Sequence, residues 1–495
     1  PDISLDAGGM LRLFRQFSSP GGTPSHVSVP TPGSIHEGGE LGYVLMHAFG
    51  AVFDNPDLLA VAVVGDGEAE TGPLEGSWKG ISFLNPAHDG AVLPILHLNG
   101  YKIAGPTVLA RKDPEQLRAL LTGHGYEVLE VGGDDVPGMH ERFHATLAYA
   151  RIREIQQAAR SGAPVGQPRW PLIVLRTPKG WTGPWEVDGV QVTDSWRAHQ
   201  VPLSGVKDNP EHLAILESWM RSYDPADLFD ADGAPLPYVR ASAPDGDKRM
   251  SATPYANGGK DVPPFVMRDM TAYEVEVPAP GVVQLESTRQ LGAMMRDFYV
   301  DNPTSFRLSS PDESNSNRVG AVFEVSDRAF MELTLPSDVA LSADGRVMEV
   351  LSEHNCHGWI EAYTLTGRQG LFATYEAFAM VSASMTIQHT KWLEEAHHLP
   401  WRTPVPSLNI LLTSTCWRND HNGFSHQGPD LIQNVINKRG TVSRIYFPPD
   451  ANSLVVVGDH CFRTQNRVNV IVIDKQPQLQ YLTLEQAKEH FERGA

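Results

Sequence analysis

The sequence predicts an α/β protein with two domains, each a mostly parallel sheet flanked by helices. Short apolar runs of five to eight residues alternate with amphipathic helical patterns. Strands that alternate with helices usually form a parallel sheet covered on both faces. A stretch rich in Pro, Gly and charged residues, 241–264, separates two segments that share this rhythm, and it is the predicted linker.

In the first half, three apolar runs are predicted to be buried strands: Leu58–Val64, Leu93–Leu98 and Pro171–Leu175. An amphipathic run from Pro114 up to Gly123 predicts a helix. Asp113 would be its N-cap, Pro114 its first residue and Gly123 the glycine just past its end.

In the second half, the helical pattern predicts a helix over Thr288–Val300 and a long helix over Glu376–Glu395. Two apolar strands are expected at Leu408–Thr413 and Val468–Ile473. Thr483 and Gln486 have the spacing of a capping box, which predicts a last helix.

The composition is that of a globular protein. Of 495 residues, 41% are hydrophobic and 20% are charged, which is enough apolar material for two or three domains. No apolar run approaches the roughly 18 residues of a membrane span, and no secretory signal opens the sequence. The net charge of −19 and the lack of a basic stripe make nucleic acid an unlikely partner.

The three cysteines, Cys356, Cys416 and Cys461, form no CxxC pair, and their odd number argues against a disulfide framework. We therefore expect a reducing, cytoplasmic setting. His421 and His426 have no Cys or acidic companion at ligand spacing, so a zinc site is rejected. Because the first residue is Pro1, we expect the chain to be a piece of a longer protein.

The segment VAVVGDGEAETG is the most informative one. A predicted strand runs into Gly65-Asp66-Gly67, and residues 68–98 separate this turn from Asn99 at the end of a second strand. Because the carboxyl ends of parallel strands meet at one sheet edge, Asp66 and Asn99 should lie side by side. Carboxylate and amide oxygens suit Mg²⁺. The alternative is that Gly-Asp-Gly is only a tight turn.

This spacing resembles the thiamine-diphosphate fingerprint of transketolases and their relatives, although the usual spacing is slightly shorter. The resemblance implies that Asp66, Asn99 and the main-chain carbonyl of Tyr101 hold Mg²⁺, which anchors the diphosphate of the cofactor.

The sequence around the fingerprint resembles phosphoketolases more closely than ordinary transketolases. The segments that carry this resemblance extend along the whole chain: TPGSIHEGGELGY, GDGEAETGPL, LPILHLNGYKIAGPT, RTPKGWTGP, SWRAHQVPL, WRNDHNGFSHQGPD and FPPDANSL. It implies a diphosphate-binding domain over 1–240, a linker over 241–280 and a pyrimidine-binding domain over 281–495. It also implies further segments at both ends that this sequence lacks.

The resemblance assigns cofactor contacts to further residues of the first domain: Gly38, Gly67, Glu68, Lys179 and His199. Glu353, in LSEHNCHGW, matches the Glu that activates the aminopyrimidine in transketolases. Without the family, a surface Glu would be the better interpretation. Tyr375 and Phe378 match the aromatic positions that hold the pyrimidine ring, although bare aromatics are more often core residues.

Three histidines are the candidate proton-transfer residues: His26, His199 and His426. A lone His is usually structural, but these lie in polar segments next to Gly or Pro, and imidazole titrates near neutrality. The resemblance also implies phosphate-binding positions at Ser316, Arg318, Asn422 and Lys475, and it places sugar hydroxyls near His426.

The function implied by the resemblance is cleavage of xylulose 5-phosphate or fructose 6-phosphate with inorganic phosphate. The products would be acetyl phosphate and an aldose phosphate. Two alternatives stay open: two-carbon transfer of the transketolase kind, and a truncated homologue that is not catalytic. Because such sites lie between subunits, the resemblance also implies a homodimer with sites at its interface.

Overall fold

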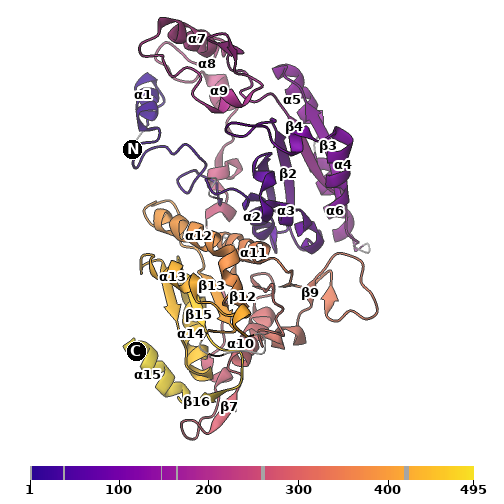
Figure 1. Ribbon diagram of the computed structural model, residues 1–495, viewed down its shortest axis with the longest axis vertical. Coiled ribbons are helices and arrows are strands. Elements are labelled where there is room, and N and C mark those ends of the chain that lie inside the picture. Colours follow the sequence, from indigo (N-terminus) through magenta and orange to yellow (C-terminus); the bar gives the residue numbers. More distant parts are fainter. Residues whose placement is uncertain are drawn as a thin grey trace.

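A computed structural model of the chain describes residues 3–36, 39–145, 148–162, 166–257, 262–416, 418 and 423–494. It contains two parallel sheets, which lie in the upper and lower parts of Figure 1. Helices flank both sheets. The predicted fold class, parallel sheets flanked by helices, is confirmed.

The first sheet has four parallel strands in the order β1-β2-β4-β3. Their bounds are β1 Leu59–Gly65, β2 Ala91–Leu98, β3 Tyr126–Gly132 and β4 Trp170–Arg176. The three predicted strands correspond to β1, β2 and β4. The sequence analysis missed β3 because this edge strand, YEVLEVG, places Glu127 and Glu130 between its apolar residues.

The helices of this half are α2 Val44–Val52, α3 Gly72–Ser77, α4 Pro114–Gly123, α5 Val136–Ala145 and α6 Ala148–Arg160. At the start of α4, the Asp113 side chain accepts a 2.9 Å hydrogen bond from Glu115 N, as an N-cap should. The predicted end of α4 was wrong by two residues. Gly123 is still helical, and the left-handed backbone (φ +101°) belongs to Gly125.

The segments outside the two sheets are mostly short. They include α1 Ala7–Gln16, the β5–β6 hairpin (Glu186–Val187 and Val190–Gln191), α7 Pro210–Arg221, α8 Pro225–Leu228 and α9 Pro237–Ala241. The described part of the predicted linker contains 3₁₀ turns such as η6 Met250–Ala252 and η7 Tyr255–Asn257. The domain boundaries at 240 and 280 stay a prediction.

The second sheet has eight strands in the order β10-β9-β11-β8-β12-β13-β15-β14. Their bounds are β8 Phe306–Ser309, β9 Arg328–Ala329, β10 Leu341–Ser342, β11 Val347–Met348, β12 Gln369–Tyr375, β13 Leu408–Thr413, β14 Ser443–Tyr446 and β15 Val468–Val472. All its pairings are parallel. Below it, β7 Val283–Leu285 and β16 Gln478–Gln480 form an antiparallel pair.

The helices of this half are α10 Thr288–Asp301, α11 Glu353–Leu365, α12 Ala383–Ala396, α13 Asp430–Ile436, α14 Ala451–Arg463 and α15 Leu484–Arg493. The capping box of Thr483 and Gln486 at the start of α15 is confirmed. The predicted helix Glu376–Glu395 was wrong in its first part. Glu376 still bonds β13, since its N donates to Thr413 O at 3.0 Å, and the α-helix begins only at Ala383, after η10 Phe378–Ser382.

The two halves meet where α2 packs on α11, between the two sheets in Figure 1. A Cβ atom on Gly50 would lie 2.3 Å from the Trp359 carbonyl oxygen, so only glycine allows this approach. Beside it, the buried Arg307 guanidinium donates to Asp54 at 2.8 and 3.0 Å and to Asp89 at 3.0 Å. A buried polar junction therefore joins the first half to β8.

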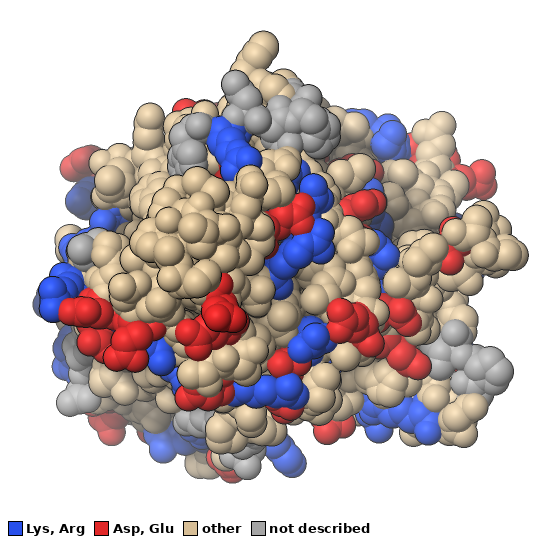
Figure 2. Space-filling view, turned by 90° about the horizontal axis from the view of Figure 1, so that it is seen from below, with Lys and Arg blue, Asp and Glu red and all other residues tan. Residues whose placement is uncertain are grey.

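None of the helices in the described part of the chain has the length and apolar composition needed to cross a bilayer. Acidic and basic side chains are interspersed over the face shown in Figure 2, and a broad area on that face carries neither.

Candidate active site

The first group of predicted site residues lies at the carboxyl edge of the first sheet; we call Asp66, Gly67, Asn99, Tyr101 and Lys179 the metal-end group. Asp66 follows β1 and Asn99 follows β2, the strand paired with it. The Asp66 carboxylate is buried and accepts from Gly100 N at 2.7 Å and from the Thr107 hydroxyl at 3.0 Å. The structure thus brings the ends of the two strands together as predicted from the sequence.

The main-chain carbonyl of Tyr101 is held in the same group. Lys179, which follows β4, donates from Nζ to this oxygen at 2.9 Å, and the Asn99 amide oxygen accepts from Tyr101 N at 3.2 Å. Burial lowers the pKa of Lys179, and the charge of Asp66 opposes that shift. The site therefore offers three hard oxygens, from a carboxylate, an amide and a carbonyl, with one cation beside them.

This oxygen set fits Mg²⁺, which takes few protein ligands and fills its other positions with phosphate oxygens and water. Within the described residues, no three His, Cys, Asp or Glu side chains come together as a metal cluster. The predicted Mg²⁺ ligands include only one side chain of these four types, Asp66. The other two ligands are an amide oxygen and a main-chain carbonyl, so a cluster of three such side chains is not expected there. The metal assignment stays a prediction.

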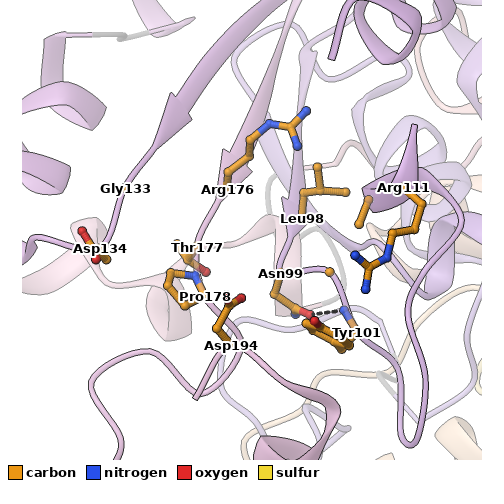
Figure 3. A pocket seen from close by; sticks show the side chains of 12 residues that line it. Leu98, Asn99, Tyr101, Arg111, Gly133, Asp134, Arg176, Thr177, Pro178 and Asp194 are labelled. Carbon is orange, nitrogen blue, oxygen red and sulfur yellow. Dashed lines mark hydrogen bonds between the residues drawn. The ribbon is translucent and has the colours of Figure 1, made fainter. Parts of the chain in front are cut away.

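A cavity of about 440 Å³ opens beside Asn99 and Tyr101, at the carboxyl ends of β2, β3 and β4 (Figure 3). Arg111 and Arg176 line it together with Asp194, and the Arg111 guanidinium lies 5.5 Å from the centre of the Tyr101 ring. Asp134 also lines the cavity, so its rim carries two guanidinium groups and two carboxylates. The sequence analysis did not select either arginine.

Glu68 and His199 border the metal-end group. Glu68 begins the turn after Gly67, and its carboxylate accepts from Gly42 N at 2.8 Å; burial raises the pKa of this side chain. His199 ends the turn η4 Trp196–His199 and is exposed. Two contacts, Asp194 N to Lys179 O at 2.8 Å and Gln200 Nε2 to Ile103 O at 3.0 Å, hold η4 beside the group.

The second group lies at the carboxyl ends of strands in the second sheet; we call Glu353, Tyr375, Phe378, His426 and Lys475 the aromatic group. The Tyr375 and Phe378 rings are stacked with centres 6.0 Å apart, and the His426 ring lies 5.0 Å from Phe378. The Lys475 ammonium lies 3.8 Å from the Tyr375 ring centre and is buried. Tyr375 and His426 thus share one site although they are 51 positions apart in the sequence.

Glu353, the first residue of α11, is half-buried, and it has an acidic neighbour that the sequence analysis missed. Burial raises the pKa of Glu353, and the negative charge of Asp312 raises it further. Asp312 accepts from Tyr375 N and from the Thr374 hydroxyl, both at 3.1 Å, and burial raises its pKa as well. Two carboxyl groups in one site favour the protonated form of at least one of them.

The remaining predicted residues are placed as follows. The Ser316 hydroxyl makes a short hydrogen bond with the Tyr375 hydroxyl, so it belongs with the aromatic group. Arg318 is paired with Glu286 at 2.8 Å. His26 is exposed and bonded to its neighbour Ser25. Gly38 and Asn422, like His421, lie outside the described residues.

Comparisons with known proteins decide the family. A family model described as the XFP N-terminal domain matches residues 1–261. A second model, described as D-xylulose 5-phosphate/D-fructose 6-phosphate phosphoketolase, matches residues 289–464. The chain belongs to the phosphoketolase family.

Two relatives that are similar to this chain over its whole length are named as probable phosphoketolases. A probable phosphoketolase of Bradyrhizobium diazoefficiens is 57% identical over 499 residues, which cover 100% of this chain and 62% of that protein. One from Streptomyces coelicolor is 56% identical over 100% of this chain and 63% of its own length. The chain therefore spans less than two thirds of the phosphoketolases it matches.

Solved transketolases share the fold of this phosphoketolase chain. A transketolase mutant from Pichia stipitis aligns with a TM-score of 0.60 at 15% identity, over 97% of this chain and 68% of the other. The transketolase of Campylobacter jejuni aligns with a TM-score of 0.57 at 15% identity, over 94% and 66%. At this identity the likeness concerns the fold, and it confirms the transketolase-like α/β architecture.

Proposed function

We propose that this chain is the cofactor-binding part of a phosphoketolase, a carbon–carbon lyase that uses thiamine diphosphate and Mg²⁺. Its reaction would convert xylulose 5-phosphate and inorganic phosphate to acetyl phosphate, glyceraldehyde 3-phosphate and water. Fructose 6-phosphate would give erythrose 4-phosphate instead. The observation that carries the proposal is the metal-end group, in which Asp66, Asn99 and the Tyr101 carbonyl converge at one sheet edge.

The metal-end group would hold the diphosphate. Asp66, Asn99 and the Tyr101 carbonyl would bind Mg²⁺, and the Lys179 ammonium would compensate negative charge beside it. A Cβ atom on Gly67 would lie only 3.3 Å from Lys102 Cγ, so the glycine keeps this turn clear of the Lys102 side chain. Gly38, Glu68 and His199 complete the proposed cofactor contacts. The bound cofactor would supply the carbanion that breaks the sugar C2–C3 bond.

The aromatic group would hold the pyrimidine end of the cofactor. Tyr375 and Phe378 offer a stacked pair of ring faces for a planar heterocycle. Glu353 would exchange a proton with the pyrimidine, and its raised pKa favours the protonated carboxyl that this task requires. We propose His26, His199 and His426 as the groups that move protons at the sugar.

The phosphate end of the substrate would bind near Lys475 and Ser316, with Arg318 and Asn422 as further proposed contacts. The buried Lys475 supplies a positive charge beside the aromatic pair. Arg318 would have to share its guanidinium between Glu286 and the phosphate, which is possible because a guanidinium has five N–H donors.

We further propose a cytoplasmic homodimer with shared sites. The metal-end group and the aromatic group lie on two different sheets, and one cofactor would have to be held by both. Leu351, two residues before Glu353, is 88% exposed, which supports a covered surface there. The described cysteines are free thiols, in keeping with a reducing compartment.

The proposal is tested by product analysis. The longest natural protein that contains this chain is incubated with each ketose phosphate and inorganic phosphate, without an aldose acceptor. Acetyl phosphate, detected as its hydroxamate, is the expected product. Activity that appears only when an aldose is added would favour two-carbon transfer of the transketolase kind. Neither activity, in folded protein that binds no thiamine diphosphate, would favour a homologue that is not catalytic.

A further inference from the structure

A set of five titratable side chains lies in the interior between the two halves, apart from both groups of the candidate site. We call it the buried histidine cluster; its members are His36, His47, His357, Glu361 and His389. Glu361 and His357 belong to α11, His47 to α2 and His389 to α12. Glu361, His357 and His389 are 0% exposed, and His47 is 1% exposed.

The Glu361 carboxylate is the centre of the buried histidine cluster. Its oxygens lie 3.3 Å from His389 Nδ1, 3.4 Å from His47 Nε2 and 3.7 Å from His357 Nε2. No well-aligned hydrogen bond reaches either oxygen from the described residues. The described part of the chain contains no set of three His, Cys, Asp or Glu arranged to hold a metal ion.

A carboxylate in this position needs a positive partner, since an unpaired charge in the interior is strongly unfavourable. Burial lowers the pKa of His36 to about 3 and that of His357 to about 4, so both are neutral at neutral pH. Burial would raise the pKa of Glu361, but the charges of His47 and His389 lower it overall. The two rings closest to the Glu361 oxygens, those of His389 and His47, are therefore the partners that we assign to this carboxylate.

Among the described residues, the other titratable groups around the cluster form no ion pair with Glu361. Glu68 and Tyr43 face His47, and His354 faces His357. Arg402 lies behind Trp392, whose ring stacks on His389, and its guanidinium donates to the carbonyls of Val29, Thr31, Ser34 and Ala256.

The cluster reaches Glu68, beside the metal-end group, through α2, the helix that carries His47. The positive charge of His47 also opposes the burial that raises the pKa of Glu68, which lies two residues after Asp66. Glu68 in turn accepts from Gly42 N at 2.8 Å, and so fixes the chain that leads into α2. His47 also contacts His36 through their Nδ1 atoms at 2.8 Å, two residues before Gly38.

We propose that Glu361 is a positioning residue for Glu68 and the metal-end group beside it. The proton that Glu361 shares with His47 and His389 holds His47 and its helix α2, and Gly42, just before α2, donates to Glu68. This inference rests on the proposed function, because it assigns Glu361 a part in cofactor binding. Glu361 touches neither cofactor nor substrate in this scheme. It acts through His47 and α2, and so reaches Glu68.

The first measurement needs no cofactor. Histidine ring resonances of selectively labelled protein are titrated by NMR in the wild type, in Glu361→Gln and in His460→Gln. His460 is a half-buried histidine on α14 outside the cluster, so the last variant is the matched control. We expect the imidazolium signals of His47 and His389 at neutral pH in the wild type and in the control, and their loss in Glu361→Gln. Neutral rings in all three proteins would overturn the proposal.

The second measurement is the affinity for thiamine diphosphate with Mg²⁺, by calorimetry across the pH range in which imidazole titrates. Glu361→Gln should weaken binding about 10- to 100-fold and flatten its pH dependence, the scale of effect expected for outer partners of a metal site. Unchanged affinity in Glu361→Gln at every pH would overturn the positioning role.

A third variant keeps the proposal testable if Glu361→Gln does not fold. His47→Gln leaves Glu361 and His389 in place, and it should give the same loss of affinity and the same flattened pH dependence. The two substitutions together should cost no more than one, because they act in one chain of contacts. Additive losses would contradict the proposal. A wild type that binds no cofactor would refute the proposed function. The NMR titration would still show whether Glu361 shares a proton with His47 and His389.

Discussion

At the residue scale, Asp66 is the side chain on which the metal assignment depends. It is buried and accepts two hydrogen bonds, which an asparagine oxygen could also accept. Asp66→Asn should therefore keep the fold but remove the negative charge that Mg²⁺ requires. We expect thiamine diphosphate affinity in the presence of Mg²⁺ to fall by about two orders of magnitude or more.

Calorimetry with and without Mg²⁺ measures this effect. Glu70→Gln is a matched control, because it makes the same change four residues along the same loop, where Glu70 pairs with Lys102 at 2.6 Å. The control should bind like the wild type. Unchanged affinity in Asp66→Asn would remove Asp66 from the metal site.

Glu353 is the corresponding test at the aromatic group. Glu353→Gln keeps the size of the side chain but cannot exchange a proton. It should bind thiamine diphosphate, yet exchange the cofactor C2 proton about 100-fold more slowly or worse. Deuterium exchange followed by NMR measures the rate, and Glu324→Gln, an exposed change in the same half, is the control. Normal exchange in Glu353→Gln would assign this task to another residue.

The pH dependence of the same exchange depends on Asp312. The pKa of Glu353 is raised by burial and then by the charge of Asp312, so its protonated form persists to higher pH than in a free Glu. A step that needs this proton, like any stability from it, is present at low pH and lost as pH rises through the raised pKa. Asp312→Asn removes the charge, so the alkaline limb of the exchange profile should move to lower pH. If the alkaline limb does not move in Asp312→Asn, Asp312 does not influence the pKa of Glu353.

At the element scale, the predictions from sequence succeeded where local signals are strong. Asp113 with Pro114 marks the start of α4, and apolar runs mark β1, β2, β13 and β15. Asp66 and Asn99 could be placed for the same reason, because each follows such a strand. The start of α12 could not be predicted. Glu376 stays in the sheet because its backbone bonds β13, and this pairing depends on tertiary structure that the local sequence does not reveal.

Strand β8 shows why other parts of the site were missed. Its sequence, FRLS, lacks an apolar run, yet all four residues are buried because Arg307 finds its partners in Asp54 and Asp89. Without β8, Asp312 was not recognised as a carboxylate just beyond a strand end. The buried histidine cluster escaped for a related reason, because its members come from three helices and a loop, and no spacing in the sequence predicts their contact.

The Arg307 junction itself yields a stability prediction. Arg307→Ala would leave Asp54 and Asp89 buried without their cation, so we expect the free energy of unfolding to fall by about 3–5 kcal/mol. Denaturant unfolding followed by circular dichroism measures it. Arg444→Ala, an arginine substitution on the edge strand β14, should cost much less. Equal losses in the two variants would show that the junction does not stabilise the contact between halves.

At the scale of the whole molecule, the two groups of the candidate site lie on two different sheets of one chain. The α2–α11 contact and the Arg307 junction fix the position of one sheet relative to the other. A productive cofactor must be held at both ends. In a symmetric dimer, the metal-end group of one subunit could face the aromatic group of the other, and the same surface would be buried on both.

Mixing of two defective subunits decides whether sites are shared in this way. One carries Asp66→Asn and the other Glu353→Gln, and neither homodimer should be active. If sites are shared, a mixed dimer combines both defects in one site and leaves its other site intact. Random exchange of equal amounts makes half of the dimers mixed, so about one quarter of the wild-type acetyl phosphate activity should return. Mass spectrometry of isotope-labelled subunits verifies the exchange. If each subunit instead builds its own site, every site keeps one defect, and no activity returns however complete the exchange is.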